Sequence, residues 1–189
     1  MFIDEKRINM FRKLIIAAIV AISFFPSNPA TATSHGKTLS NLNNNDIMFA
    51  QMMIPHHQQA IDMSKYAQKN SSNKEIKALA SAISSAQGRE ITQMKYWLSA
   101  TKSPATMGHH MDMNGMISDK QMKELSALKG AKFDKAFLSA MIEHHQGALE
   151  MVELLNSTKN AEAKKLAKEI IRVQKAEISS MKKLLAKSA

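Results

Sequence analysis

Two stretches of eighteen residues decide the fold of this chain. The first is Asp46–Met63, DIMFAQMMIPHHQQAIDM, and the second is Asp134–Met151, DKAFLSAMIEHHQGALEM. They are identical at nine of eighteen positions, which include two adjacent histidines followed by a glutamine. Similarity of this extent between two parts of one chain is the signature of an internal repeat. The sequence therefore predicts two copies of one structural unit.

The similarity continues downstream of both stretches, where residues 73–98 match residues 160–185 at twelve of 26 positions. Within each eighteen-residue stretch, apolar residues and one histidine recur at spacings of three and four, which places them on one face of a helix. This stripe consists of Phe49, Met53, His56, Ala60, Met63 and Ala67 in the first copy, and of Phe137, Met141, His144, Ala148, Met151 and Leu155 in the second.

Polar runs rich in Asn and Ser follow both stripes, at 70–73 and 156–158, and these residues break and cap helices. Each unit is therefore predicted to be a helical hairpin. Two hairpins joined by one long connection favour an all-α fold, an antiparallel four-helix bundle. The expected boundaries are 45–98 for the first hairpin, 99–132 for the connection and 133–187 for the second hairpin, within a bundle that spans 45–189.

Pro55 departs from the repeat, because the second copy has Glu143 at this position. Proline has no amide hydrogen, and its ring crowds the carbonyl of the residue four positions earlier. Two outcomes remain open at this stage. Either the first helix kinks at Pro55, or Pro55 starts a new helix after a short one.

Residues 1–32 have the layout of a secretory signal peptide. Basic residues precede an apolar run at 14–25, and Ala30-Thr31-Ala32 supplies a cleavage site of small residues. The twelve-residue run is short for a membrane span, so an uncleaved anchor is the less favoured alternative. Met10 is an alternative start. We expect a periplasmic or secreted protein with a flexible N-terminus at 33–44 and no stable membrane insertion after cleavage.

The chain is basic, with a net charge of +10, or +8 once residues 1–32 are removed. The lysines are spread along the predicted helices, and no nucleic-acid recognition motif accompanies them. We therefore expect no nucleic-acid partner.

The chain has no cysteine but fifteen methionines. Thioether sulfur is a soft ligand that suits Cu(I), although methionine also fills gaps in apolar cores. Composition leaves both roles open.

The two histidine pairs are candidate metal ligands, because residues four apart on a helix share a face. Met53 is expected to lie beside His57, and Met52 beside His56. In a hairpin turning near Ser71, we predict that His56 approaches the partner helix at Gln87, Glu90 and Met94. The equivalent positions in the second copy are Met141, His144, Gln174, Glu177 and Met181. A buried histidine in a helical stripe is more often a hydrogen-bonded core residue, so the structural role also remains open here.

The connection favours the metal-binding interpretation. Residues 107–116, MGHHMDMNGM, contain four methionines and two histidines in a stretch whose glycines do not suit a packed helix. The predicted metal ligands are therefore Met48, Met52, Met53, His56, His57, Met63, Glu90, Met94, Met107, His109, His110, Met111, Met113, Met116, Met141, His144, His145, Met151 and Met181. Downstream, Ser118 is predicted to cap a short helix.

The doubled motif, together with Asp46, Phe49, Ala60 and Met63, resembles that of a large bacterial family first described as a domain of unknown function. The resemblance covers residues 43–187. It implies a ferritin-like four-helix bundle and copper handling, because several family members are periplasmic copper-binding proteins linked to copper resistance. The implied ligand is copper, with Cu(I) preferred, Cu(II) also bound and Ag(I) as a mimic. A copper efflux or sensor protein is a candidate partner.

Three other functions compete with copper binding. A ferritin-like di-iron oxidase typically uses four glutamates and two Glu-x-x-His motifs, and this chain has no Glu-x-x-His in either copy. A copper oxidase and a metal-free adaptor bundle are the remaining alternatives. The sequence favours a binding protein that is not an enzyme.

Overall fold

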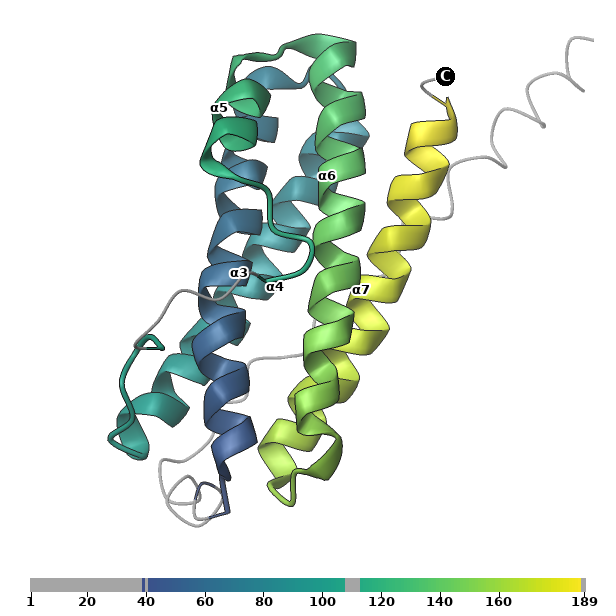
Figure 1. The fold of residues 1–189 in the computed structure, drawn as a ribbon. Helices are drawn as coiled ribbons and strands as arrows, with labels where there is room; N and C mark the ends of the chain where they lie inside the picture. The colour runs from purple at the N-terminus through teal and green to yellow at the C-terminus, as the bar shows by residue number, and fades with distance from the viewer. Residues whose placement is uncertain (1–38, 40, 108–112, 188–189) are drawn as a thin grey trace, which may run out of the picture. The chain divides into compact units, whose positions relative to one another are not determined.

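The computed structural model describes Leu39, residues 41–107 and residues 113–187, all within the compact unit Thr33–Ala189. The predicted signal peptide at 1–32 lies outside the described residues, as does the 108–112 segment of the connection. The described part is helical and contains no strand (Figure 1). Its elements are α3 (Asn44–Asn70), α4 (Lys74–Ala100), α5 (Asp119–Ala127), α6 (Gly130–Met151), the 3-10 helix η1 (Val152–Ser157) and α7 (Ala161–Lys187).

The predicted all-α bundle is confirmed, with α3, α4, α6 and α7 as its four long helices. Helices α3 and α4 pack as one hairpin, α6 and α7 form the other, and α3 also packs against α6 (Figure 1). The short helix α5 lies in the connection and contacts α3 and α6. Because α3 contacts two other long helices, two of its faces are buried.

Polar residues at the helix starts explain why the helices begin where they do. At α3, the Asn43 side chain accepts from the Asp46 amide at 3.0 Å, and the Asp46 carboxylate accepts from the Asn43 amide at 2.9 Å. Asn73 accepts from backbone amides at the start of α4, and Asn160 does the same at α7. Ser118 caps α5 as predicted.

Pro55 lies inside α3, which continues as one helix from Asn44 to Asn70. Of the two outcomes left open by the sequence, the start of a new helix at Pro55 is therefore wrong. A proline inside a helix costs about 3 kcal/mol. Met53 and His56, on either side of it, are fully buried, and burying one large apolar side chain contributes about 1.5–3 kcal/mol. Packing along the whole stripe outweighs the loss at one residue.

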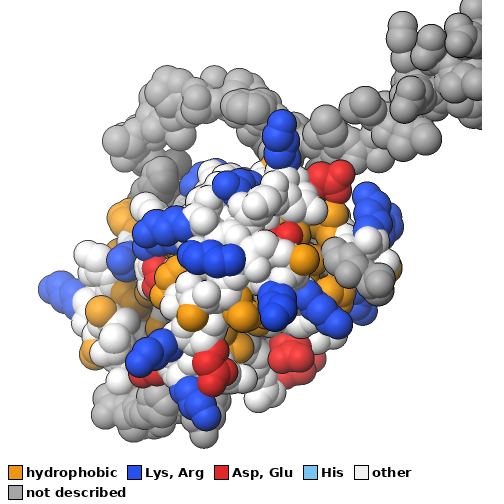
Figure 2. Space-filling view, turned by 90° about the horizontal axis from the view of Figure 1, so that it is seen from above, with side chains coloured by type: hydrophobic (Ala, Val, Ile, Leu, Met, Phe, Trp, Pro, Cys, Tyr) orange, Lys and Arg blue, Asp and Glu red, His pale blue; other side chains and the backbone are white. Residues whose placement is uncertain are grey.

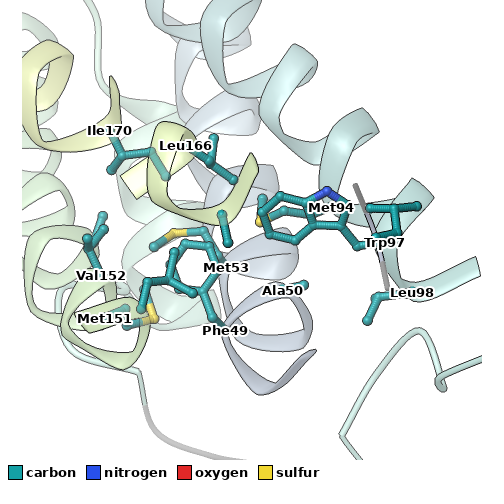
Figure 3. Close-up of a cluster of buried hydrophobic side chains, with 14 residues drawn as sticks. Phe49, Ala50, Met53, Met94, Trp97, Leu98, Met151, Val152, Leu166 and Ile170 are labelled. Atoms are coloured by element: carbon teal, nitrogen blue, oxygen red, sulfur yellow. The ribbon is translucent and has the colours of Figure 1, made fainter. Parts of the chain in front are cut away.

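The apolar core consists of two clusters, one toward each end of the bundle. The first contains Leu39, Phe49, Ala50, Met53, Met94, Trp97, Leu98, Ala148, Met151, Val152, Leu155, Ala163, Leu166 and Ile170 (Figure 3). The second contains Ala60, Met63, Ala67, Ile76, Ala80, Ile83, Leu125, Phe133, Phe137, Leu138, Met141, Ile142 and Met181. On every long helix the boundary between the two clusters falls at polar residues, which we call the polar layer. Its members are His56, His57, Gln87, Glu90, His144, His145, Gln174 and Glu177.

The surface carries dispersed charge. On the face shown in Figure 2, Lys and Arg side chains are interspersed with acidic, polar and apolar ones, and the described histidines are not visible there. This distribution is typical of a solvated surface. In the described part of the chain, no helix is both long enough and apolar enough to cross a membrane.

Candidate metal centre

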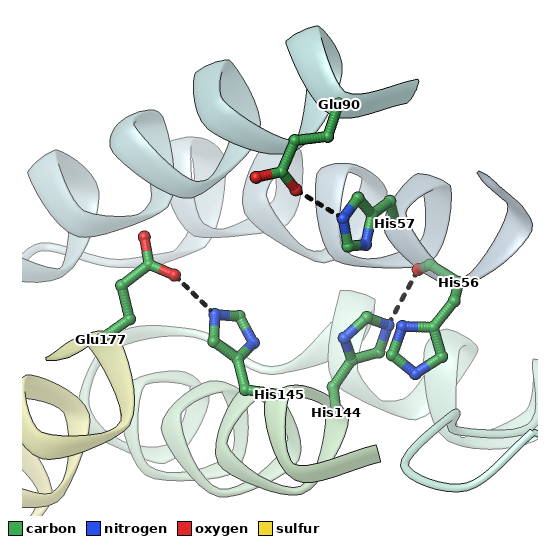
Figure 4. Close-up of polar contacts among 6 residues, drawn as sticks. All are labelled: His56, His57, Glu90, His144, His145 and Glu177. Atoms are coloured by element: carbon green, nitrogen blue, oxygen red, sulfur yellow. Dashed lines mark hydrogen bonds and ion pairs between the residues drawn. The ribbon is translucent and has the colours of Figure 1, made fainter. Parts of the chain in front are cut away.

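Four fully buried histidines meet in the polar layer, where α3 packs against α6. The ring centroids of His56 and His144 lie 3.7 Å apart, with their planes inclined at 36° (Figure 4). Within each adjacent pair the centroids are farther apart, at 6.4 Å for His56–His57 and 6.3 Å for His144–His145. The duplication thus brings its two copies together at one histidine from each.

The outer histidines, His57 and His145, each bind a carboxylate of the second helix in the same hairpin. His57 Nε2 donates to Glu90 Oε2 at 2.6 Å, and His145 Nε2 donates to Glu177 Oε2 at 2.8 Å (Figure 4). The prediction that His56 faces Glu90 is therefore wrong. Adjacent residues on a helix point about 100° apart, so His56 faces α6 while His57 faces α4.

The inner histidines, His56 and His144, bind backbone carbonyls. His144 Nε2 lies 2.9 Å from the carbonyl oxygen of His56, and His56 Nε2 lies 3.2 Å from that of Asn114. A carbonyl oxygen only accepts hydrogen bonds. The proton of each inner ring is therefore on Nε2, which leaves Nδ1 with a free lone pair.

Burial keeps the inner histidines neutral. It lowers the pKa of His56 to about 3, an effect reinforced by His57 and opposed by the Asn114 carbonyl. The pKa of His144 is lowered well below its usual value, first by burial and then by the nearby His56 and His145. Neutral imidazole is the form that binds metal ions. At neutral pH both inner rings are in that form.

Among the residues that the structure describes, all four histidine Nδ1 atoms are buried and have no hydrogen-bond partner. The same is true of both amide atoms of Gln87 and of Gln174 in the same layer. Unpaired polar atoms in a protein interior are destabilising and call for a specific explanation. The outer histidines also match a recurring arrangement of metal-binding histidines, in which the other ring nitrogen donates to a carboxylate.

The described residues contain no group of three or more His, Asp or Glu side chains placed to hold a metal ion. A metal bound in this layer would therefore need a further ligand, such as a thioether, or a rearrangement of the rings.

The predicted methionine ligands fall into two groups. The buried group consists of Met53, Met94 and Met151 in the first apolar cluster (Figure 3) and of Met63, Met141 and Met181 in the second. The half-buried group consists of Met48 and Met52 on α3 and of Met107, Met113 and Met116 in the connection. His109, His110 and Met111 lie outside the described residues. The structure thus brings the histidine pairs together but distributes the methionines along the bundle.

Sequence reasoning missed the backbone of the connection as part of this site. Asn114 supplies the acceptor for His56, and Gly115 follows it with a positive φ of 81°. An Asn-Gly dipeptide is a turn signal, so the turn itself was detectable. Its position over the histidines depends on packing between distant segments, which no local pattern encodes.

An antiparallel four-helix bundle, crossed at its middle by a layer of buried histidines, defines the class of this protein. The profile described as "Domain of unknown function (DUF305)" matches residues 46–185. The chain belongs to this family, which confirms the resemblance inferred from the doubled motif.

Solved structures of similar proteins share this fold. A DUF305 protein from Streptomyces coelicolor is 31% identical, with a TM-score of 0.73, and the match covers 76% of this chain and 93% of that one. CopM in its Cu(II)-bound form is 38% identical, with a TM-score of 0.67 and coverage of 76% and 97%. CopM in its Cu(I)-bound form is 37% identical, with a TM-score of 0.65 and coverage of 75% and 96%. The search of curated proteins found no match.

Proposed function

We propose that this chain is a copper-binding protein that sequesters Cu(I), and also Cu(II), and thereby contributes to copper resistance. One observation carries the proposal, namely the 37–38% identity to CopM in copper-bound forms over almost the whole CopM chain. CopM has also been solved with silver bound, at 35% identity. Silver(I) and Cu(I) are both soft ions, so the same ligands suit both.

The donor chemistry of the chain supports this function. The polar layer offers four buried Nδ1 atoms that have no hydrogen-bond partner in the described part of the chain, and the connection offers half-buried thioethers at Met107, Met113 and Met116. Imidazole accepts either oxidation state of copper, whereas thioether favours Cu(I). The absence of cysteine from the sequence leaves no thiol that copper could oxidise to a disulfide.

We place the protein in the periplasm or outside the cell, because residues 1–32 have the layout of a signal peptide. Its role there is binding rather than catalysis. A copper efflux or sensor protein is the proposed recipient of the metal, since a sequestering protein must eventually release its cargo.

Anaerobic Cu(I) titration of the purified protein tests the proposal. We expect stoichiometric binding, and a lower stoichiometry when Met107, Met111, Met113 and Met116 are replaced by leucine. Met122→Leu is the matched control, because Met122 is half-buried in α5 and is not a predicted ligand. If the stoichiometry is unchanged after the methionines and histidines of 107–116 and both histidine pairs have been replaced, the proposal fails.

A thermal melt separates this function from that of a metal-free adaptor bundle. A ligand that binds only the folded state raises the midpoint of unfolding. We expect Cu(I) and Ag(I) under reducing conditions to raise the midpoint, and Mg²⁺, which prefers oxygen ligands, to leave it unchanged. An adaptor bundle would show no shift with any of these ions.

A further inference from the structure

The segment Met113–Ile117, which we call the strap, runs between α3 and α6 (Figure 1). It contacts both inner histidines, at the ring of His56 and at the backbone of His144. On the α3 side, the side chain of Gln59 binds both backbone groups of Ile117. It donates to the Ile117 carbonyl at 2.7 Å and accepts from the Ile117 amide at 2.9 Å. One turn earlier on α3, His56 donates to the Asn114 carbonyl at 3.2 Å. Three hydrogen bonds therefore fix the strap to α3.

On the α6 side the strap lies in direct contact with the helix backbone. A Cβ atom on Gly147 would lie 1.8 Å from the carbonyl oxygen of Asn114. A Cβ atom on Gly115 would lie 2.4 Å from the carbonyl oxygen of Glu143 and 2.9 Å from His144 Cα. The side-chain amide of Asn114 also donates to the Glu150 carboxylate at 2.7 Å. Only glycine at 115 and 147 permits this approach.

The strap uses positions at which the two copies of the repeat differ. Gln59 of the first copy corresponds to Gly147 of the second, because the copies are offset by 88 residues. The glutamine side holds the strap by hydrogen bonds, and the glycine side makes room for its backbone. A single strap across a duplicated bundle accounts for the difference between Gln59 and Gly147.

We propose that the strap covers the His56–His144 pair, holds the proton of His56 on Nε2 through the Asn114 carbonyl, and must detach before a metal ion reaches these rings. Gln59 and Gly147 are positioning residues in this arrangement, since they act on the histidines through the strap. The cover that the strap forms over the two rings, and the Nε2–H tautomer of His56, are properties of the metal-free protein. The control of metal entry rests on the proposed function.

Gly147→Ala tests the proposal from the α6 side, because its methyl group displaces the Asn114 carbonyl. Gly88→Ala is the matched control, since a Cβ atom there meets nothing within 4 Å. Gln59→Met tests the α3 side by removing both hydrogen bonds to Ile117. Gln58→Met controls for it, because Gln58 is exposed and its side-chain amide donates to Asp62 on the same helix rather than to the strap.

Two measurements on the metal-free protein report on the strap. The first is the rate at which diethyl pyrocarbonate modifies each histidine, resolved by peptide mass spectrometry. We expect Gly147→Ala and Gln59→Met to raise the rates at His56 and His144 about tenfold. Each variant loses one or two hydrogen bonds of the strap, which lowers the free energy of local opening. The second is the imidazole ¹⁵N spectrum, in which His56 should be a pure Nε2–H tautomer in the wild type and a mixture in both variants. The controls should match the wild type in both measurements.

Unchanged rates and an unchanged His56 tautomer in the folded variants would refute the strap, whatever the copper affinity. If Gly147→Ala does not fold, Gln59→Met decides alone. Stopped-flow transfer of Cu(I) from a coloured chelator then tests metal entry, which should be faster in both variants. If neither the wild type nor the variants take up copper, the proposed function fails, whereas the effects on the metal-free protein stand.

Discussion

The imidazole rings of His56 and His144 lie 3.7 Å apart, although 88 residues separate them in the chain. Each comes from the same position of the repeat, so the contact lies where the two copies meet. Two protonated rings at this distance would repel each other, and both rings are fully buried. The contact therefore excludes simultaneous protonation of the two rings, and burial lowers the pKa of each.

Acid is expected to destabilise the metal-free protein through this pair. The pKa of His56 is about 3 in the folded state against about 6.5 for an ordinary histidine, so between these pH values the unfolded chain binds the additional proton. The contribution of His56 is fully present above pH 6.5 and is lost as the pH falls toward 3, at about 1.4 kcal/mol per pH unit. His144 adds a loss of the same sign. Denaturant unfolding at pH 7, 5.5 and 4.5 measures the slope.

His56→Asn provides the control for the acid effect, because asparagine takes up no proton in this range. The free energy of unfolding of this variant should fall less steeply with decreasing pH than that of the wild type. The difference in slope should correspond to the uptake of about one proton fewer on unfolding. A wild-type stability that is flat between pH 7 and 4.5 would contradict the neutral assignment of the inner histidines.

The carboxylate pairs of the outer histidines predict a second effect on stability. Glu177→Gln removes the charge that accepts from His145 Nε2 at 2.8 Å, next to a fully buried ring. Hydrogen bonds to charged groups contribute about 1.5–3 kcal/mol, so we expect a loss of about 2 kcal/mol at pH 7. The comparison is Glu169→Gln, which breaks an exposed pair with Arg172 worth about 0.5 kcal/mol. Equal losses in urea unfolding would show that the buried pair is not special.

Much of the fold was predictable, because the repeat, the apolar stripe and the capping residues are all local patterns. The stripe from Phe49 to Ala67 is buried as predicted, and Ser118 caps α5 as predicted. These patterns need only the period of a helix and the hydrogen-bonding preferences of its ends.

The exact partners in the site were less predictable. Helical spacing placed His56 and His57 about 100° apart, but it did not show which neighbouring helix each would meet. The wrong assignment of Glu90 to His56 followed from treating α3 as buried against one helix, when it is buried against both α4 and α6. The contact of Gly147 with the strap joins residues far apart in the chain. Such contacts depend on the relative placement of helices.

Two glycine substitutions should change stability in opposite directions. Gly88 lies inside α4 with open space at its Cβ position, so Gly88→Ala should stabilise the protein by about 0.8–1 kcal/mol through helix propensity. Gly130 begins α6 with a φ of +57°, where an L-residue costs about 1–2 kcal/mol. Gly130→Ala should therefore destabilise it. Thermal melts of both variants measure the two shifts, and stabilisation by Gly130→Ala would show that the left-handed conformation is not required there.

Replacing a buried methionine by leucine separates its packing role from a ligand role. Met53 is fully buried in the first apolar cluster, close in sequence to both histidines of α3 (Figure 3). Leucine has a similar volume, so Met53→Leu should change the stability of the metal-free protein by less than about 1.5 kcal/mol. Met53→Ala leaves a cavity and should cost about 2–5 kcal/mol.

Leucine has no sulfur, so Met53→Leu should also reduce the rise in melting temperature produced by Cu(I) if the thioether binds the metal. Met122→Leu on α5 controls for the loss of a methionine outside the predicted ligand set and should keep the full Cu(I) shift. Melting scans with and without Cu(I), under anaerobic reducing conditions, measure both effects on the same samples. A full Cu(I) shift in Met53→Leu would assign Met53 to the core alone and would leave the connection and the histidines as the copper ligands.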